Sequence, residues 1–118
     1  MADQTIQDRS YEFACRVIRL VDYIARKSLV MRTIARQLLK SATSVGANLE
    51  EASGAQSKPD FISKCSIAAK EARETRYWLR LLDATKTIKS PRLAPLTKEA
   101  REIVASLSAI IRNANLPK

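Results

Sequence analysis

Apolar and small residues recur at alternating spacings of four and three in this chain, and that repeat constrains its fold more than any other feature. The most regular run is Phe61, Cys65, Ala68, Ala72, Thr75, Leu79 and Leu82. This spacing places the side chains on one face of an α-helix and is typical of the seam of a coiled-coil-like bundle rather than of a strand. Three further segments repeat in a similar way, and only two glycines and four prolines interrupt the chain, so the sequence predicts long helices.

The breaks between the periodic segments define four predicted helices, at residues 8–27, 29–53, 58–85 and 91–114. Ser57 and Asp60 have the form of a capping box, with Pro59 in the first turn of the third helix. Because the joints are short, consecutive helices should be antiparallel, which predicts an all-α, up-down-up-down four-helix bundle. A chain of 118 residues has room for one such core, so residues 1–118 are predicted to form a single domain.

Composition argues against several classes of protein. Nothing approaches the run of about 20 apolar residues that a membrane span needs. The first residues have neither the basic start nor the apolar run of a signal peptide. Two cysteines far apart in the sequence, Cys15 and Cys65, suit a reducing cytoplasm better than a disulfide scaffold. The prediction is a cytoplasmic protein with no membrane partner.

Enzyme chemistry is also disfavoured, because the chain has no histidine. That removes the usual general base and the Glu-x-x-His pairs that hold two metals in ferritin-like bundles. Four glutamates could form an acid/base pair or gather around a metal: Glu50, Glu51, Glu71 and Glu74. Neighbouring basic residues favour ordinary helix-surface ion pairs instead. Both cysteines are predicted to be buried thiols rather than nucleophiles. We therefore predict no enzymatic activity, no catalytic residue, no metal site and no cofactor.

The net charge of +9, with a pI near 10.0, points to polyanions as partners. Every charged residue between Arg26 and Lys40 is basic, and so is every one between Lys86 and Lys98. An up-down topology brings these runs to one end of the bundle, whereas Glu50, Glu51 and Asp60 reach the other. The residues predicted to contact RNA or DNA phosphates are Arg26, Lys27, Arg32, Arg36, Lys40, Lys86, Lys89, Arg92 and Lys98. The alternative is a solvated basic face that only prevents aggregation.

Two stripes off the core seam are candidate surfaces for an oligomer or protein partner. One stripe lies on the second helix and the other, which includes the only tryptophan, on the third. Their residues are Gln37, Ser44, Asn48 and Glu51, and Ile67, Glu71, Glu74, Trp78 and Leu81. Trp78 has a second interpretation, in which it covers the bundle core from the flank. Further apolar residues off the seam favour oligomerisation as a way to cover them.

The block from residue 36 to 82 also resembles a known family. It contains Ser44-Val45-Gly46-Ala47-Asn48-Leu49-Glu50-Glu51 and, further on, Asp60-Phe61. In these features, and in Gln37, it is similar to bacterial four-helix-bundle proteins encoded in intervening sequences of 23S rRNA genes. The resemblance implies a left-handed antiparallel bundle that forms a homopentamer. It also points to a relative, the accessory protein of diversity-generating retroelements, a basic pentamer that binds nucleic acid and a reverse transcriptase.

These observations lead to two hypotheses of different classes. The first is a non-enzymatic, oligomeric bundle whose basic end contacts RNA or DNA, with a larger nucleoprotein as a further partner. The second is a homo-oligomeric scaffold for protein–protein interaction, with incidental positive charge. Salt dependence of binding distinguishes them, because phosphate contacts weaken steeply as salt rises.

Overall fold

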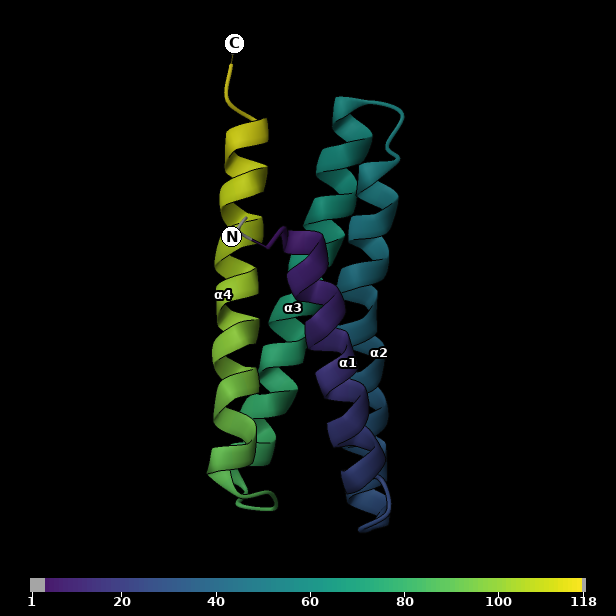
Figure 1. The fold of residues 1–118 in the computed structure, drawn as a ribbon, viewed down its shortest axis with the longest axis vertical. Helices are drawn as coiled ribbons and strands as arrows, with labels where there is room; N and C mark the ends of the chain where they lie inside the picture. The colour runs from purple at the N-terminus through teal and green to yellow at the C-terminus, as the bar shows by residue number, and fades with distance from the viewer. Residues whose placement is uncertain (1–3, 118) are drawn as a thin grey trace.

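Four helices make up most of residues 4–117, the part of the chain that this computed structural model describes. They are α1 (Ile6–Ile24), α2 (Leu29–Ser53), α3 (Lys58–Ala84) and α4 (Ser90–Ala114). Consecutive helices run in opposite directions along an elongated bundle (Figure 1). No strand occurs in the described residues. The predicted all-α four-helix bundle is confirmed, whereas its left-handed sense stays a prediction.

The helix starts have the capping chemistry that the sequence indicates. Thr5, Ser28 and Ser57 each accept a hydrogen bond from the amide three residues later, at 3.0–3.1 Å. The Asp60 carboxylate reaches back to the amide of Gln56 at 3.3 Å, which completes the cap of α3. Because Thr5 caps α1, this helix begins two residues earlier than its apolar pattern predicts, and it ends three residues earlier, at Ile24.

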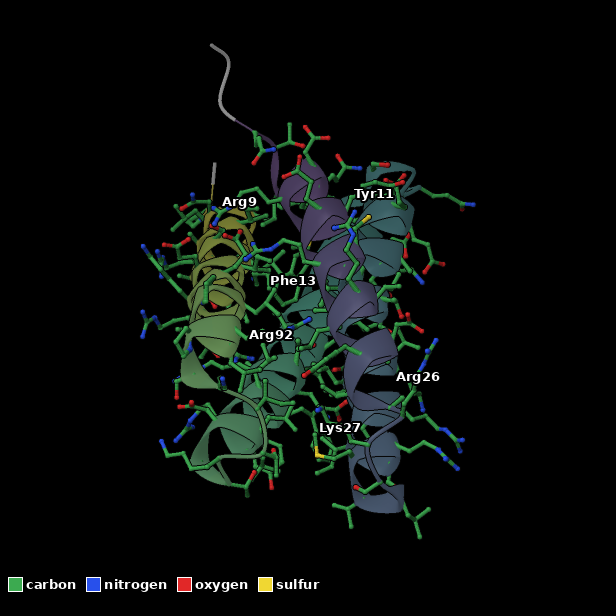
Figure 2. The ribbon with its side chains drawn as sticks, turned by 60° about the horizontal axis from the view of Figure 1, so that its bottom comes forward. Arg9, Tyr11, Phe13, Arg26, Lys27 and Arg92 are labelled. Carbon is green, nitrogen blue, oxygen red and sulfur yellow. The ribbon has the colours of Figure 1, made fainter. Side chains whose placement is uncertain are left out.

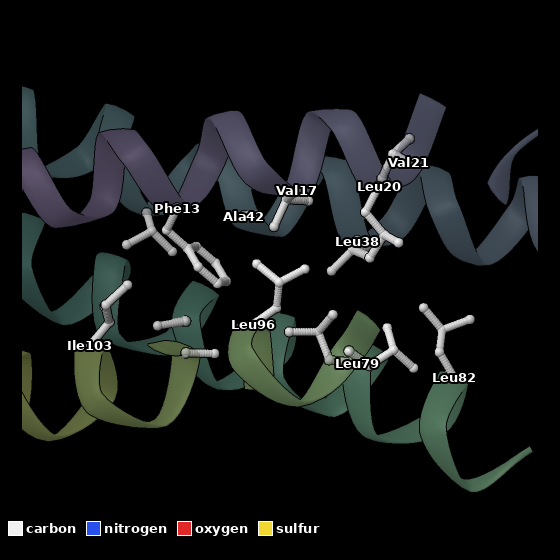
Figure 3. Packing of buried hydrophobic residues seen from close by; sticks show 14 of the residues in the cluster. Phe13, Val17, Leu20, Val21, Leu38, Ala42, Leu79, Leu82, Leu96 and Ile103 are labelled. Carbon is white, nitrogen blue, oxygen red and sulfur yellow. The ribbon is translucent and has the colours of Figure 1, made fainter. Parts of the chain in front are cut away.

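The core is a continuous column of aliphatic side chains with one aromatic ring at its centre. Phe13 and Val17 from α1, Leu38 from α2 and Leu79 from α3 all belong to this core and are almost fully buried, with Phe13 beside Ala42 of α2 (Figure 3). Each helix packs against two neighbours, in the order α1, α2, α3, α4 and back to α1. The α2–α3 and α3–α4 contacts are the most extensive, and the α1–α4 contact is the least extensive. The seam between α1 and α4 is therefore the loosest in the bundle.

One buried polar contact fixes how α2 lies against α3. The Ser41 and Thr75 hydroxyls are 2.9 Å apart in the core, and each also reaches a carbonyl of its own helix. Further along, Glu51 pairs with Lys64 at 3.6 Å. Both contacts fit an antiparallel pair in which residue numbers rise along α2 as they fall along α3.

The topology brings two joints to one end of the bundle, as predicted. Residues 25–28 connect α1 to α2, and residues 85–89 connect α3 to α4, both at the bottom of Figure 1. Ile88 is buried and anchors the second joint. Lys86 in this joint has φ of 57°, a left-handed conformation that residues with a side chain seldom adopt. We call this end, with its two joints, the basic end.

Candidate nucleic-acid interface

A cavity of about 540 Å³ opens at the basic end between the last turn of α1 and the start of α4. It is lined by Tyr23, Lys27, Thr87, Ile88, Lys89, Pro91 and Arg92. We call it the Tyr23 pocket. Three of its seven lining residues are basic, and none is acidic.

Tyr23 is the aromatic centre of this pocket and is in contact with two cations. Its ring centroid lies 4.4 Å from the Lys27 ammonium nitrogen and 4.0 Å from the Arg92 guanidinium carbon, so both contacts are of the cation–π type. Lys27 is also the main cause of a lowered pKa of the Tyr23 phenol, through a hydrogen bond and its positive charge; Arg92 and Lys89 lower this pKa less. The ring remains 45% exposed and can meet a ligand.

A second cavity, of about 210 Å³, adjoins the first along the loose seam between α1 and α4. Its lining residues are Arg16, Arg19, Leu20, Arg92, Pro95 and Leu96. Arg92 lines both cavities, so they form one surface. We call the two cavities together the α1–α4 groove. Figure 2 shows Arg92 and Lys27 on the side of α1 that faces α4, with Arg26 on its other side.

The basic side chains of the groove have no carboxylate partner in the described part of the chain. The ion pairs there are Arg9–Glu99, Arg9–Glu102, Arg26–Asp22 and Lys64–Glu51. Arg16, Arg19, Lys27, Lys89 and Arg92 take part in none of them. Five cations along one groove therefore repel each other and produce a positive potential that an anion would relieve.

At the end of the α1–α4 seam that lies away from the joints, ion pairs take the place of unpaired cations. Arg9 of α1 donates to Glu99 and to Glu102 of α4, both at 2.9 Å. These bonds join the two helices and place two carboxylates beside the seam. The groove is open and basic toward the joints, and it is closed by ion pairs at its other end.

The structure gathers only part of the predicted phosphate-contact set in the groove. Lys27, Lys89 and Arg92 line the Tyr23 pocket. The other six predicted residues are exposed outside the two cavities: Arg26, Arg32, Arg36, Lys40, Lys86 and Lys98. Arg26, in the first joint, forms an exposed ion pair with Asp22 of α1 at 3.5 Å.

Sequence reasoning missed Arg16, Arg19 and Tyr23. A usable signal existed, because Arg16, Tyr23 and Lys27 are spaced by seven and four and so share one flank of a helix. The prediction instead counted runs of like charge near the joints. That count found the correct end of the bundle but not the seam between the helices.

The two predicted interface stripes lie on one side of the bundle. The contacts Ser41–Thr75 and Glu51–Lys64 bring the flank of α2 alongside the flank of α3. We call the combined surface the α2–α3 face; its residues are Gln37, Ser44, Asn48, Glu51, Ile67, Glu71, Glu74, Trp78 and Leu81.

The surroundings of Trp78 agree in part with both of its predicted roles, as an interface residue and as a cover for the bundle core. It is half-buried and packs against the core, with its ring 5.1 Å from that of Tyr77 in an edge-to-face contact. Its buried indole N–H has no hydrogen-bond acceptor among residues 4–117. Ile67 on the same face is 39% exposed. The face thus combines apolar surface with an unpaired donor.

Comparison with known proteins identifies the family. The sequence pattern of the 23S rRNA-intervening sequence protein family matches residues 2–109. The chain belongs to this family. Among solved structures, it is similar to a protein of unknown function from the S23 ribosomal protein family of Bacteroides thetaiotaomicron. The two share 40% identity and a TM-score of 0.84, over 91% of this chain and 98% of the other. Comparison with curated proteins gives no match.

Three findings concern metal binding, cysteine reactivity and membrane insertion. The described residues contain no group of three or more histidine, cysteine, aspartate or glutamate side chains placed to hold a metal. Burial raises the pKa of the Cys65 thiol, which disfavours the reactive thiolate. None of the helices, over the part of the chain described, is long and apolar enough to cross a membrane.

Proposed function

We propose that this protein is a non-enzymatic nucleic-acid-binding protein whose α1–α4 groove contacts phosphates. The observation that carries the proposal is the set of five basic side chains without ion-pair partners along one groove, around an exposed tyrosine. A basic surface that only kept the protein soluble would have no need of a shared groove or of an aromatic centre. Phosphate contacts supply sequence-independent affinity, which such a groove can provide.

The exposed cations outside the groove support the same proposal at longer range. Arg32, Arg36 and Lys40 recur at four-residue spacing on α2, toward the basic end. At physiological ionic strength the Debye length is about 8 Å, so these charges steer a polyanion toward this end without each having to touch it. The family is named for intervening sequences of 23S rRNA, and the solved relative belongs to a family named as ribosomal. RNA is therefore the first polymer to test.

The test is a salt titration of binding to RNA and to duplex DNA. A variant with Lys27, Lys89 and Arg92 changed to Gln should lose most of its affinity for both polymers. Its logarithmic salt slope should fall by about 0.7 for each single-strand phosphate that the variant no longer neutralises, and by about 0.9 for each duplex phosphate. A matched control changes Lys58, Lys70 and Arg112 to Gln, which removes the same charge from exposed positions outside the groove. Equal losses of affinity in the two variants would refute the groove as the site.

A second candidate function is a homo-oligomeric scaffold for protein–protein interaction in the cytoplasm, assembled through the α2–α3 face, with incidental positive charge; the larger nucleoprotein remains a partner only under the first proposal. The scaffold is favoured by the exposed surface of Ile67 and by the part of Trp78 that the bundle leaves uncovered. A neighbouring subunit would cover both. The homopentamer expected from the family resemblance remains part of this proposal.

Oligomer formation is tested by sedimentation of the Ile67→Lys variant. Ile67 lies outside the core, so a charge there should dissociate an oligomer without unfolding the subunit. The matched control is Ile18→Lys, at a similarly exposed position on α1. A wild-type protein that sediments as a monomer at all concentrations would remove this candidate.

A further inference from the structure

The groove contains more than a phosphate site requires, because its widest part is built around an aromatic ring. We propose that the Tyr23 pocket binds one nucleotide of a single strand, with the base stacked on Tyr23 and its phosphate on Lys89 and Arg92. This inference rests on the proposed function and specifies the form of nucleic acid that the groove takes.

The composition of the pocket argues for a whole nucleotide rather than a bare phosphate. Tyr23, Ile88 and Pro91 contribute aromatic and apolar surface, and Lys27, Lys89 and Arg92 contribute charge. A bare anion gains nothing from the first group. Base stacking on an aromatic ring, beside a backbone held by cations, is the usual arrangement of proteins that bind single strands. The cavity of about 540 Å³ is within the usual range of about 300–1,000 Å³ for small-molecule sites, which suits one nucleotide.

The position of the ring argues for a single strand rather than a duplex. Tyr23, in the last turn of α1, shares its pocket with the joint at residues 85–89 and the first turn of α4. A base can reach it only by leaving its own stack, which is easy for an unpaired nucleotide and requires unpairing in a duplex. A duplex can still contact the exposed cations by its phosphates. The ring therefore adds affinity for single strands alone.

The cations that now contact the ring can take up new positions when a base arrives. Lys27 is exposed and flexible, so its ammonium can move from the ring to a phosphate. The Arg92 guanidinium lies 4.0 Å from the ring centroid, and its long side chain can turn from the ring to the phosphate when the base stacks on Tyr23. Beyond the pocket, Arg16 and Arg19 line the next part of the groove and can hold the adjoining phosphates.

The experiment compares wild-type protein with Tyr23→Leu in fluorescence anisotropy. The probes are a short mixed-sequence RNA strand, a blunt-ended two-strand duplex of the same length and a strand whose nucleotides are abasic. Tyr23→Leu should weaken binding of the intact strand by at least about fivefold, the lower limit for removal of one base–aromatic stack. Binding of the duplex and of the abasic strand should change less than about twofold, because neither offers an unpaired base to the ring. Because the cations remain, the salt slope should stay the same.

Two further variants control for indirect effects. Tyr23→Phe keeps the ring and should bind the strand as the wild type does. Tyr77→Leu removes a tyrosine that is 53% exposed on α3 and lines neither cavity, and it should have no effect. Circular dichroism confirms that each variant is folded.

The outcomes separate this inference from the proposed function. Unchanged strand binding by Tyr23→Leu, together with weakened binding by the Lys27, Lys89 and Arg92 variant, would overturn base stacking and leave phosphate contact standing. Failure of wild-type protein to bind either polymer at low salt would overturn both. Adenosine monophosphate that binds as tightly as the strand, with the same dependence on Tyr23, would overturn the assignment to a polymer.

Discussion

The buried hydroxyl pair between α2 and α3 gives the sharpest test of how the bundle is assembled. Ser41→Ala leaves Thr75 with its own carbonyl partner, Glu71, at 2.8 Å. Thr75→Val leaves Ser41 with the Leu38 carbonyl at 3.2 Å. Because each surviving hydroxyl keeps a backbone acceptor, each single change should lower the free energy of unfolding by only about 1 kcal/mol, the lower end of the range for a disrupted buried hydrogen bond.

The double variant should be nearly as stable as either single variant. With both hydroxyls gone, no polar atom of the pair is left to desolvate, so the second change removes little more. The double variant should therefore be about 1 kcal/mol more stable than the sum of the two single changes would predict, and this difference is the interaction term of the double-mutant cycle. For a domain of this size, about 1 kcal/mol corresponds to roughly 4 °C in Tm.

Urea unfolding at one fixed protein concentration measures the cycle, because association would shift the apparent stability. The control cycle combines Ser41→Ala with Thr85→Val. Thr85 also bonds a carbonyl of its own helix, Leu81, but it is exposed near the basic end. That cycle should be additive to within about 0.5 kcal/mol. Additivity in the Ser41–Thr75 cycle as well would refute the proposed alignment of α2 against α3.

Three further predictions concern the core, the second joint and the pocket. Phe13→Ala, at a site that is 2% exposed, should lower the free energy of unfolding by about 3–5 kcal/mol in urea titrations, whereas Tyr11→Ala on the exposed face should change it by less than about 0.5 kcal/mol. Lys86→Gly should raise the thermal midpoint, with a gain of up to about 1 kcal/mol, because glycine adopts the positive φ at this position without strain; a lower midpoint would contradict this account. The pKa of Tyr23 in the folded protein lies below its ordinary value of 10.0. Ionisation of Tyr23 therefore adds to the free energy of unfolding as pH rises from the folded pKa toward 10.0. This contribution is lost as pH falls through the folded pKa. Tyrosinate absorbance, corrected with Tyr23→Phe for the other tyrosines, should show the pKa return toward 10.0 in Lys27→Met, and no change there would exclude Lys27 as its main cause.

The helices could be predicted because their signals are local. The four–three repeat of α3 is complete within the helix, and the caps at Ser28 and Ser57 need only the next few residues. The starts and ends of α1 were less accessible to sequence reasoning. The cap at Thr5 lies outside the apolar repeat, and residues 25–27 leave the helix to make the turn into α2.

The groove could be predicted only in part, because it depends on which flanks of two helices face each other. Charge runs and topology place Lys27, Lys89 and Arg92 at one end, as the structure shows. The contribution of Arg16 follows from the rotation of α1 about its axis, which is set by the packing of Phe13 and Val17. The contact between Arg9 and Glu99 joins residues far apart in the sequence, and no local pattern indicates it.

The ion pairs of Arg9 give the groove a fixed length. A strand bound as proposed, entering at the joints and following α1, would meet Glu99 and Glu102, whose two negative charges outnumber the one positive charge of Arg9 and would repel it. From Tyr23 back to Arg16 the helix rises only about 10 Å. Under the proposed function, one groove would therefore contact only a short stretch of a strand. A longer polymer should then bind more copies of the protein rather than enter one groove more deeply, so the stoichiometry of the complex should report the length of the strand.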